Sequence, residues 1–595
     1  MNDESHENIL RGLSASDGIA MGNVFIVSHG DVEVSHYKIT EANTAEEIKR
    51  FESALVQTRQ DILAIKNEIS DRVGHSEAGI FDAHLMVLED VALIEETFNI
   101  LHSELYNIDY CYQKAAQKFI DAFGSIDDPF MRERISDIKD VSRRVINNLL
   151  GKKGSKLNLV SEPKIVIAED FLPSDFALLD SKNILGLATE KGSLTSHTAI
   201  MARSMKIPCV VAVNGLMSSL NQNDFILIDG YTGSIYENPS EKTLRRYEEV
   251  DSTHKQIEFL YNTSLPFPNK MLSGQEYKLS VNISGSDDLT EEVLHNMSGV
   301  GLFRTENYFI DSGSFPSEEN QFLVYRQVAE KAGNKPVVIR TLDLGGDKNF
   351  ANFNVFKKEQ NPFMGYRAIR FCLDHEDVFL NQLRAILRAS AFGKIKILFP
   401  MISLPNELRK AKEFVEKAKA QLIEQGKDFD KNIQIGAMIE VPSAALTTDI
   451  LAKMCDFISI GTNDLIQYMY AVDRVNDKVA YLYEPASPAI VRVLNTIVSA
   501  ANAANCEVCV CGEIAADPVF ASLLLGMGVQ ELSMSYSSLP QIKFLLRKVE
   551  MNELQKLRDE VLSIDNARGV MGKLKEFYHS KIHKFLNLPN ANLHG

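Results

Sequence analysis

Polar side chains directly follow several short apolar runs in the C-terminal half of the chain. They are Arg304, Arg340, Glu440, Asn463, Asp464 and Cys511. Arginine forms paired hydrogen bonds with phosphate or carboxylate oxygens and stays charged at every working pH. Two carboxylates suit Mg²⁺, which takes a few oxygen ligands together with substrate phosphate and water. These residue types therefore predict a site for a polyanion and a divalent cation.

Further basic residues lie close to this set in the sequence, namely Lys348, Arg367 and Arg474. For any single arginine, a structural ion pair with a neighbouring carboxylate is the simpler interpretation, because such pairs are common. Structural ion pairs do not account for the whole set, because all of these residue types suit a site for a polyanion and a metal ion.

The segment CEVCVC raises a separate question, because Cys506, Cys509 and Cys511 could together bind a metal ion. In a strand, alternation places Cys509 and Cys511 on one face and Cys506 on the other, which disfavours a structural zinc site. Cys506 and Cys509 are then best interpreted as small buried hydrophobic residues. Cys511 precedes Gly512 and Glu513 at the predicted end of the strand and is the candidate acid.

A second candidate site is the segment GSLTSHTAIMARSMKIP, in which His197 stands at the predicted start of a short helix. A helix N-terminus disfavours the imidazolium form and offers free N–H groups to a phosphate. Both effects suit a neutral, nucleophilic imidazole that carries a phosphoryl group. From the spacing alone, a helix-capping histidine without chemistry explains this position equally well.

The elements that must position the first set are eight runs rich in β-branched residues, separated by helical segments. The runs are 278–284, 300–304, 336–340, 394–400, 433–440, 457–464, 507–513 and 529–535. Strands that alternate with helices in this way predict a parallel (β/α)₈ barrel. In such barrels the loops at the C-terminal ends of the strands build the site, and that is where the polar residues lie.

The N-terminal half predicts a different architecture. Strand-like segments occur at 9–30 and return after about residue 157, so we expect both pieces to form one α/β domain. Between them, Ile48, Phe51 and Leu55 begin an apolar pattern with steps of three and four, typical of a helical bundle. A bundle core explains this pattern fully, and insertion into a surface loop is well tolerated. The charged segment 239–262 predicts a linker helix.

Composition limits the class of protein. A chain of 595 residues is too long for a single core, so several domains are expected. A net charge of −17 argues against broad nucleic-acid or membrane binding. No apolar run approaches the roughly 18 residues of a membrane span, and the polar start MNDESHENILRG is unlike a signal peptide. Seven cysteines do not suggest a disulfide framework, so we expect a reduced cytoplasmic protein.

With these residues in view, the sequence resembles enzyme I of the bacterial sugar phosphotransferase system, the phosphoenolpyruvate–protein phosphotransferases. The resemblance runs from about Gly12 to the end of the chain. It rests on TSHTAIMAR (195–203), GVGLFRTE (299–306), VVIRTLDLGGDK (337–348), NPFMGYRAIR (361–370), FISIGTNDLIQY (457–468) and CGEIA (511–515). Each motif is moderately specific and the combination is very specific.

The resemblance implies a swivelling phosphohistidine α/β domain with an inserted helical bundle, followed by a TIM-like (β/α)₈ barrel. The expected boundaries are 9–35 and 152–238 for the α/β domain, 36–151 for the bundle, 239–265 for the linker helix and 266–595 for the barrel. The bundle, including FDAHLMVLED (81–90), would bind the phosphocarrier protein HPr. The barrel would bind phosphoenolpyruvate and form a homodimer.

The resemblance also implies a role for each candidate residue. His197 would take the phosphoryl group of phosphoenolpyruvate on a ring nitrogen and pass it to a histidine of HPr, to energise sugar uptake or regulation. Glu440 and Asp464 would bind Mg²⁺, and Cys511 would protonate the departing enolpyruvate to give pyruvate. The substrate would be held by Arg304, Arg340, Asn463, Asp464, Arg474, Lys348 and Arg367.

The chain departs from the family pattern around His197 more than in the barrel. Leu172 replaces a usual threonine, and Ser193 and Leu194 replace the usual glycine and polar residue. These differences leave open a catalytically altered regulatory protein that binds phosphoenolpyruvate. A barrel lyase or isomerase acting on pyruvate-like acids is a further alternative, but it would leave His197 without a role.

Overall fold

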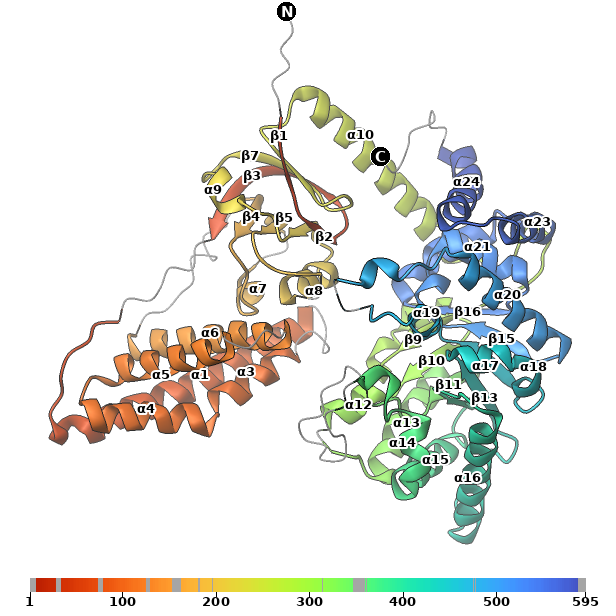
Figure 1. Ribbon diagram of the computed structural model, residues 1–595, viewed down its shortest axis with the longest axis horizontal. Helices are drawn as coiled ribbons and strands as arrows, with labels where there is room; N and C mark the ends of the chain where they lie inside the picture. Colours follow the sequence, from red (N-terminus) through yellow and green to blue (C-terminus); the bar gives the residue numbers. More distant parts are fainter. Residues whose placement is uncertain are drawn as a thin grey trace, which may run out of the picture. The chain divides into compact units, whose positions relative to one another are not determined.

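The computed structural model describes residues 7–27, 34–72, 79–124, 129–151, 162–179, 182–194, 196–312, 314–345, 359, 361–474, 476 and 478–586 (Figure 1). The chain divides into two compact units, Met1–Thr253 and His254–Gly595. Among the helices described here, none has the length and apolar character that a membrane span requires.

The first unit contains an eight-stranded mixed sheet in its described part, with strand order β1-β8-β7-β3-β4-β5-β6-β2. Its strands are β1 (Asn8–Arg11), β2 (Leu13–Ser16), β3 (Ile19–Val27), β4 (Lys164–Ala168), β5 (Ile184–Thr189), β6 (Cys209–Val211), β7 (Phe225–Asp229) and β8 (Ser234–Glu237). Strands β3 to β6 pair in parallel, whereas the outer pairs are antiparallel. Short helices α7 (Asp175–Leu178), α8 (His197–Ser204) and α9 (Leu216–Ser219) connect the later strands.

A helical bundle interrupts this sheet between β3 and β4, so strands from both sides of the insertion pair with each other. Its helices are α1 (Thr44–Arg72), α3 (Ile80–Leu88), α4 (Val91–Glu104), α5 (Ile108–Gly124) and α6 (Pro129–Leu149). The apolar pattern of the sequence forms the bundle core, where Phe51, Ile62 and Ile69 are buried. Helix α4 begins where the Asp90 carboxylate accepts hydrogen bonds from the first free N–H groups. Helix α10 (Glu241–Asn262) covers the charged segment that follows β8.

The second unit contains, in its described part, eight strands that close into a barrel in which every neighbouring pair is parallel. They are β9 (Lys278–Ile283), β10 (Val300–Arg304), β11 (Val337–Arg340), β12 (Ile395–Phe399), β13 (Gln434–Ile439), β14 (Phe457–Ile460), β15 (Glu507–Val510) and β16 (Glu531–Met534). The predicted parallel (β/α)₈ barrel is therefore confirmed.

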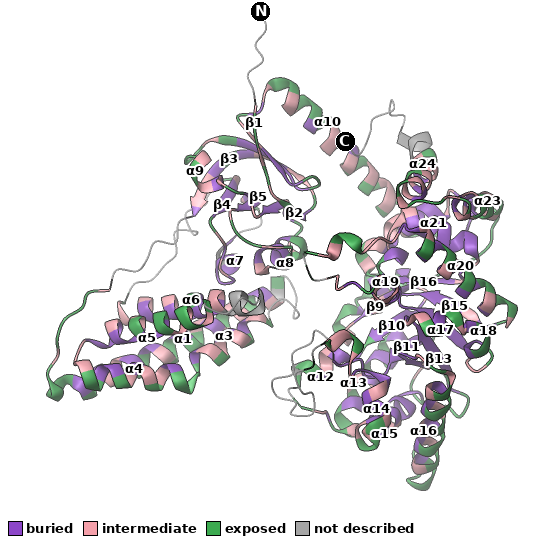
Figure 2. Cartoon of the chain, in the orientation of Figure 1, coloured by how far each residue is buried: buried purple, intermediate pink, exposed green. Residues whose placement is uncertain are grey.

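Helices separate successive barrel strands and cover the outside of the barrel (Figure 1). They are α11 (Glu291–Asn296), α12 (Glu306–Asp311), α13 (Glu318–Ala332), α14 (Ile369–Asp374), α15 (Glu376–Ala389), α16 (Pro405–Glu424), α17 (Pro442–Leu446), α18 (Thr448–Leu451), α19 (Thr462–Tyr470), α20 (Pro488–Ala503), α21 (Pro518–Met527), α22 (Leu539–Leu546), α23 (Met551–Leu562) and α24 (Ala567–Leu586). Figure 2 shows buried strands inside and exposed faces on the surrounding helices.

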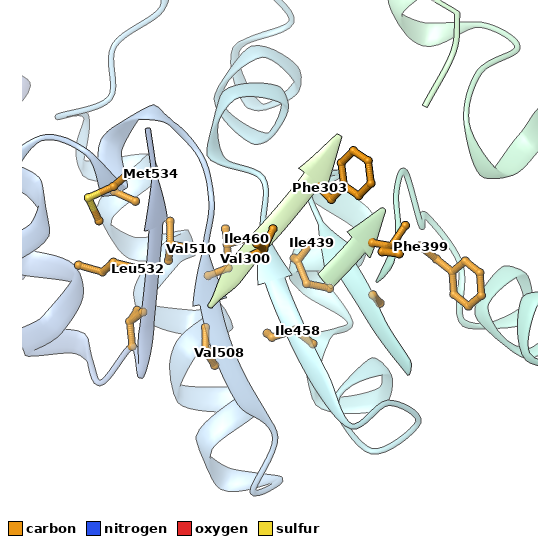
Figure 3. Packing of buried hydrophobic residues seen from close by; sticks show 14 of the residues in the cluster. Val300, Phe303, Phe399, Ile439, Ile458, Ile460, Val508, Val510, Leu532 and Met534 are labelled. Carbon is orange, nitrogen blue, oxygen red and sulfur yellow. The ribbon is translucent and has the colours of Figure 1, made fainter. Parts of the chain in front are cut away.

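Alternation along the barrel strands separates two sets of side chains. Ile458, Ile460, Val508 and Val510 belong to the large core between strands and helices (Figure 3). A smaller buried cluster joins one residue from each of β10 to β14 with Cys511, which directly follows β15; its members are Leu302, Val338, Leu398, Met438, Phe457 and Cys511. Because strand side chains repeat every two residues, the positions two beyond this smaller cluster face the same way. Arg304, Arg340 and Glu440 occupy such positions at the C-terminal ends of their strands.

Candidate functional site

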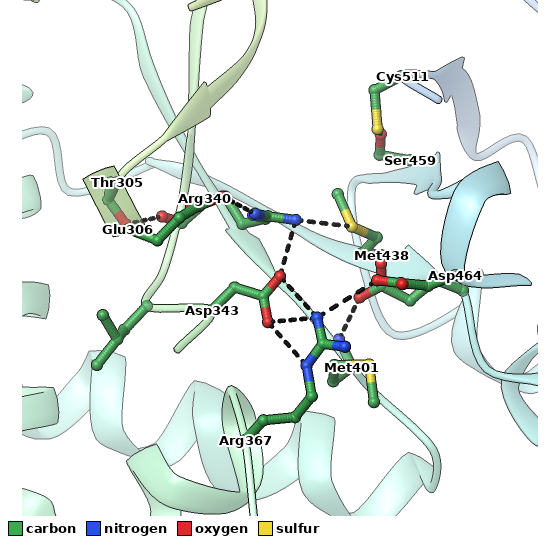
Figure 4. A network of polar contacts seen from close by, with 12 residues as sticks. Thr305, Glu306, Arg340, Asp343, Arg367, Met401, Met438, Ser459, Asp464 and Cys511 are labelled. Atoms are coloured by element: carbon green, nitrogen blue, oxygen red, sulfur yellow. Dashed lines mark hydrogen bonds and ion pairs between the residues drawn. The ribbon is translucent and has the colours of Figure 1, made fainter. Parts of the chain in front are cut away.

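Arg340, the last residue of β11, is a buried cation held between two carboxylates (Figure 4). Its Nη2 lies 2.5 Å from Oε1 of Glu306, and its Nη1 lies 3.0 Å from Oδ2 of Asp343. Its buried Nε has no hydrogen-bond partner among the described residues. Burial alone would lower the pKa of Arg340, but Glu306, Asp343 and Glu440 more than offset this and raise it. The guanidinium is thus permanently charged and keeps one unpaired N–H.

Arg367 lies in the loop before α14 and reaches the same carboxylate. Its Nη2 donates to both oxygens of Asp343, at 2.9 and 3.1 Å, and approaches Oδ2 of Asp464 at 3.4 Å. Its Nη1 donates to the hydroxyl of Tyr468 at 3.2 Å. Asp343 therefore bridges the two arginines, as Figure 4 shows, and fixes the distance between two positive charges.

Glu440 follows β13 and is almost completely buried. Burial, with Asp464 and Asp343 nearby, raises the pKa of Glu440 to about 8. Its Oε1 accepts a hydrogen bond of 2.6 Å from the Met401 backbone N–H. A Cβ added at Gly461 would lie only 2.6 Å from Oε2 of Glu440, so the close approach of β14 requires glycine there.

The donor set of Glu440 and Asp464 fits a hard divalent cation. Neighbouring carboxylates disfavour ionisation of Glu440 because their negative charges repel, and a bound cation would relieve that repulsion. Across the described residues, no group of three or more His, Cys, Asp or Glu side chains is arranged to hold a metal ion. Mg²⁺ favours a site in which two carboxylates are ligands and substrate oxygens and water fill the remaining coordination positions.

A cavity of about 690 Å³ opens beside the C-terminal ends of the strands, and Asn282, Arg304, Cys511, Glu513 and Tyr536 are among its lining residues. Arg304 is exposed here, unlike the buried Arg340. The cavity is large enough for a three-carbon phosphorylated acid. An exposed guanidinium and a thiol therefore line the same cavity.

The Cys511 thiol is buried at the end of β15. Its Sγ accepts a hydrogen bond of 3.2 Å from Oγ of Ser459 and lies 3.6 Å from the Ile460 carbonyl oxygen. Burial raises the pKa of Cys511, while Ser459 and Arg340 act in the opposite direction. A thiol with a raised pKa keeps its proton at neutral pH and can donate it.

The remaining predicted barrel residues have separate surroundings. Asn463 and Glu513 exchange two hydrogen bonds, of 2.9 and 3.0 Å, between the start of α19 and the loop after β15. Arg474 interacts with the hydroxyl of Tyr483. Lys348 falls outside the described residues, so its place in the site stays a prediction. Hydrogen bonds and ion pairs join Arg340, Arg367 and Asp464 in one network through Asp343, whereas Arg474 contacts Tyr483.

Several residues that the sequence reasoning did not single out complete the network. Glu306 and Asp343 hold the arginines, Tyr468 contacts Arg367, and Ser459 contacts Cys511. All four lie inside motifs that the sequence reasoning quoted. Their position near the strand-end arginines and thiol was the available signal, but the sequence does not indicate which carboxylate pairs with which arginine.

In the first unit, His197 is the first residue of α8. The side chain of Ser196 caps this helix by accepting a hydrogen bond of 3.4 Å from the Ala199 N–H. Burial lowers the pKa of His197 below its usual value, against the opposing effect of Asp137. His197 thus lies at the N-terminus of a helix, and burial favours its neutral form.

Acidic and imidazole groups from the bundle face His197. His84 of α3 lies 3.2 Å from Oδ1 of Asp137, and Asp140 accepts hydrogen bonds of 3.2 and 2.8 Å from the N–H and hydroxyl of Ser174. Asp137, Asp140 and His84 all act electrostatically on His197. The segment 81–90, predicted to bind a carrier, thus also supplies a buried residue close to the candidate nucleophile.

The residues that depart from the family pattern have defined local roles. The Leu172 N–H donates to Oδ2 of Asp175 at 2.8 Å, and the Ser193 carbonyl accepts from the Ser196 hydroxyl at 2.8 Å. Leu194 is 47% exposed, and its carbonyl oxygen accepts from the Arg203 guanidinium. The backbone carbonyl groups of Ser193 and Leu194 thus help to hold the segment before His197.

Three parts of the chain match known protein families. Residues 261–551 match the PEP-binding domain of PEP-utilising enzymes, 11–134 match their N-terminal domain, and 160–233 match their mobile domain. Arg304, Arg340, Glu440 and Cys511 lie within the first match, and His197 lies within the third.

Curated relatives match over nearly the whole length. A phosphoenolpyruvate-protein phosphotransferase of Geobacillus stearothermophilus is 38% identical over 97% of this chain and 100% of its own. The protein of the same name from Bacillus subtilis is 36% identical over 96% of this chain and 99% of its own. A solved structure described as an NMR solution structure of Enzyme I (nEIt) is 38% identical over 41% of this chain and 99% of its own, with a TM-score of 0.35.

Proposed function

Because the chain belongs to the family of phosphoenolpyruvate-protein phosphotransferases, we propose that it transfers the phosphoryl group of phosphoenolpyruvate first to His197 and then to a carrier protein. The observation that carries the proposal is the buried pair Arg340 and Arg367, bridged by Asp343 within the match to the PEP-binding domain. Two fixed cations beside two carboxylates suit a substrate that carries both phosphate and carboxylate groups.

The barrel residues position the donor. Arg304, Arg340 and Arg367 bind the phosphate and carboxylate oxygens, and Arg474, Asn463 and Lys348 complete the substrate shell. Phosphoryl transfer depends mainly on positioning and on neutralising charge, which is what fixed guanidinium groups supply. The free Nε of Arg340 supports this role, since a buried donor without a partner is ready for a substrate oxygen.

Glu440 and Asp464 hold Mg²⁺ in this proposal, and Asp464 also contacts substrate. When bound, Mg²⁺ neutralises phosphate charge. Glu440 must be ionised to act as a ligand, so metal and proton compete for the same carboxylate. The raised pKa of Glu440 supports this competition at neutral pH.

His197 and Cys511 carry the two bond-making steps. A ring nitrogen of His197 forms a bond to phosphorus while the bond from phosphorus to the enol oxygen breaks. The Cys511 thiol gives its proton to the methylene carbon of enolpyruvate, which yields pyruvate and a thiolate that solvent reprotonates. The lowered pKa of His197 supports its nucleophilic form.

The proposal also assigns roles to larger parts of the chain. His197 and the arginine network belong to different compact units, so the transfer requires the units to approach, with the segment around α10 as hinge. HPr is the proposed acceptor and binds the helical bundle, including 81–90. We place the reaction in the cytoplasm and assign homodimer formation to the barrel.

The test is phosphorylation of purified HPr with this chain as the sole catalyst, in the presence of phosphoenolpyruvate and Mg²⁺. Wild type and His102→Ala, a change at an exposed bundle histidine, are expected to phosphorylate HPr equally. His197→Ala is expected to give none. Phosphorylation of HPr by the His197→Ala protein, or its absence with wild type, would overturn the proposal.

A further inference from the structure

Ser459 is a completely buried serine of β14 whose hydroxyl faces thiols. Its Oγ donates to Sγ of Cys511 over 3.2 Å (Figure 4). In the strand register, Ser459 pairs with Cys509, two residues before Cys511, so the hydroxyl and both thiols share one face of the sheet. Buried serine hydroxyls usually bond to a backbone carbonyl, as Ser522 does with the Pro518 oxygen at 3.2 Å. A hydroxyl aimed at sulfur therefore needs an explanation.

We propose that Ser459 is a positioning residue for the proton donor: its hydroxyl orients the Cys511 thiol and stabilises the thiolate that remains after the proton has moved to the substrate carbon. The inference rests on the acid role of Cys511 in the proposed function. It assigns to Ser459 a part in the second half of the reaction, the formation of pyruvate, and none in phosphoryl transfer to His197.

The surroundings of the thiol explain why such a donor is needed. Cys511 packs against an apolar cluster that includes Leu302, Met438 and Phe457. A thiolate formed there loses the hydrogen bonds that water would give it, and burial disfavours it. Hydrogen bonds to an ionised group are stronger than those between neutral groups, so the bond from Ser459 strengthens as the proton leaves.

The charged groups that face Cys511 come from several strands. Arg304 and Arg340, on β10 and β11, favour the thiolate, whereas Glu440 after β13 opposes it. On its own strand, Cys509 is a second thiol near Ser459. In the proposed function the arginines also bind the anionic oxygens of the substrate, so their charge is shared between the thiolate and the substrate. The Ser459 hydroxyl is neutral and keeps its effect in every state of the site.

The test uses full-length Ser459→Ala and a matched control, Ser522→Ala, in which an equally buried serine of the same unit donates to a backbone carbonyl instead. Single-turnover pyruvate release and phosphorylation of His197 are measured separately across pH. In parallel, alkylation of Cys511 by iodoacetamide is followed by peptide mass spectrometry at each pH.

We expect Ser459→Ala to shift the alkylation profile of Cys511 upward by about one pH unit and to slow pyruvate release about tenfold. The KM for phosphoenolpyruvate and the rate of His197 phosphorylation should not change. Ser459→Thr, which keeps the hydroxyl, should restore the profile, and Ser522→Ala and Cys509→Ala should match wild type. A merely structural role would change stability but not the titration of one thiol.

The role of Ser459 and the acid role of Cys511 can be contradicted by different results. An unshifted alkylation profile in a folded Ser459→Ala protein would overturn the inference and leave the acid role of Cys511 intact. Normal pyruvate release by Cys511→Ala would overturn that acid role, and the inference with it.

Discussion

At the residue scale, the carboxylates around Arg340 and Arg367 hold the two guanidinium groups in fixed positions. Asp343 contacts both Arg340 and Arg367, and Glu306 holds the other side of Arg340. A guanidinium that is fixed before binding loses less conformational freedom when it meets a phosphate. Asp343 thus acts through the arginines.

This arrangement predicts the effect of Asp343→Asn, which keeps the shape of the side chain and removes its charge. We expect the free energy of unfolding to fall by about 3 kcal/mol, because two buried cations lose a shared partner. The KM for phosphoenolpyruvate should rise about tenfold. Urea unfolding and steady-state pyruvate release measure the two effects. Asp559→Asn, at an exposed ion pair with Arg558, is the control and should leave both unchanged.

The raised pKa of Glu440 predicts that the stability of the protein depends on pH and that bound Mg²⁺ reduces this dependence. Its pKa is raised from an ordinary carboxyl value to about 8 in the folded protein. Between these two values the folded state holds a proton that the unfolded state has released, so stability falls as pH rises. In the presence of a chelator, the melting temperature of wild type should therefore fall between about pH 5 and pH 9. Mg²⁺ should reduce this fall, since it selects the ionised carboxylate.

The matched variant for this pH dependence is Glu440→Gln, which cannot ionise. Without metal it should lose less stability over the same pH range than wild type, and Mg²⁺ should no longer change the slope. Identical slopes for the two proteins in chelator, measured by calorimetry, would show that Glu440 is not the group responsible.

At the scale of elements, strand ends were the most predictable feature. Apolar runs such as 336–340 and 433–440 predicted buried parallel strands. Because side chains in a strand alternate with a period of two, Arg340 and Glu440 face the same way as the inward-facing Val338 and Met438. The same period correctly separated Cys511 from Cys506, which packs in the outer core.

Loop contacts were not predictable in the same way. Arg367 lies just before α14 and 24 residues beyond Asp343, so its bonds to Asp343 depend on tertiary packing. Likewise, Ser174 and Asp140 meet only because the inserted bundle packs against the α/β domain. Contacts between residues far apart in the chain are set by tertiary packing, which periodicity does not report.

The bundle allows a prediction at this scale. Asp90 caps α4 by accepting hydrogen bonds from the N–H groups of Ala92 and Leu93, at 2.8 and 3.2 Å. Asp90→Ala should lower the stability of the bundle by about 1 kcal/mol, while single-turnover pyruvate release in the absence of urea should remain at the wild-type rate. Glu95→Ala, at an exposed position of the same helix, is the control. Helical circular dichroism during urea unfolding measures the difference.

At the scale of the whole molecule, His197 and the arginine network belong to separate compact units. This division predicts that binding and transfer can be uncoupled in the full chain. His197→Ala should bind phosphoenolpyruvate with Mg²⁺ as tightly as wild type, because no arginine contact changes, but it should release no pyruvate. Isothermal titration calorimetry with a parallel pyruvate assay tests this. An affinity loss of more than about threefold would place His197 in the binding site itself.

Whether the phosphoryl group passes through His197 can be measured by incubating the protein with phosphate-labelled phosphoenolpyruvate and Mg²⁺ without an acceptor. We expect one acid-labile phosphoryl group per chain, located by peptide mapping on His197, and one pyruvate released for each group bound. Pyruvate formed without labelled protein, or equal labelling of His197→Ala, would contradict it.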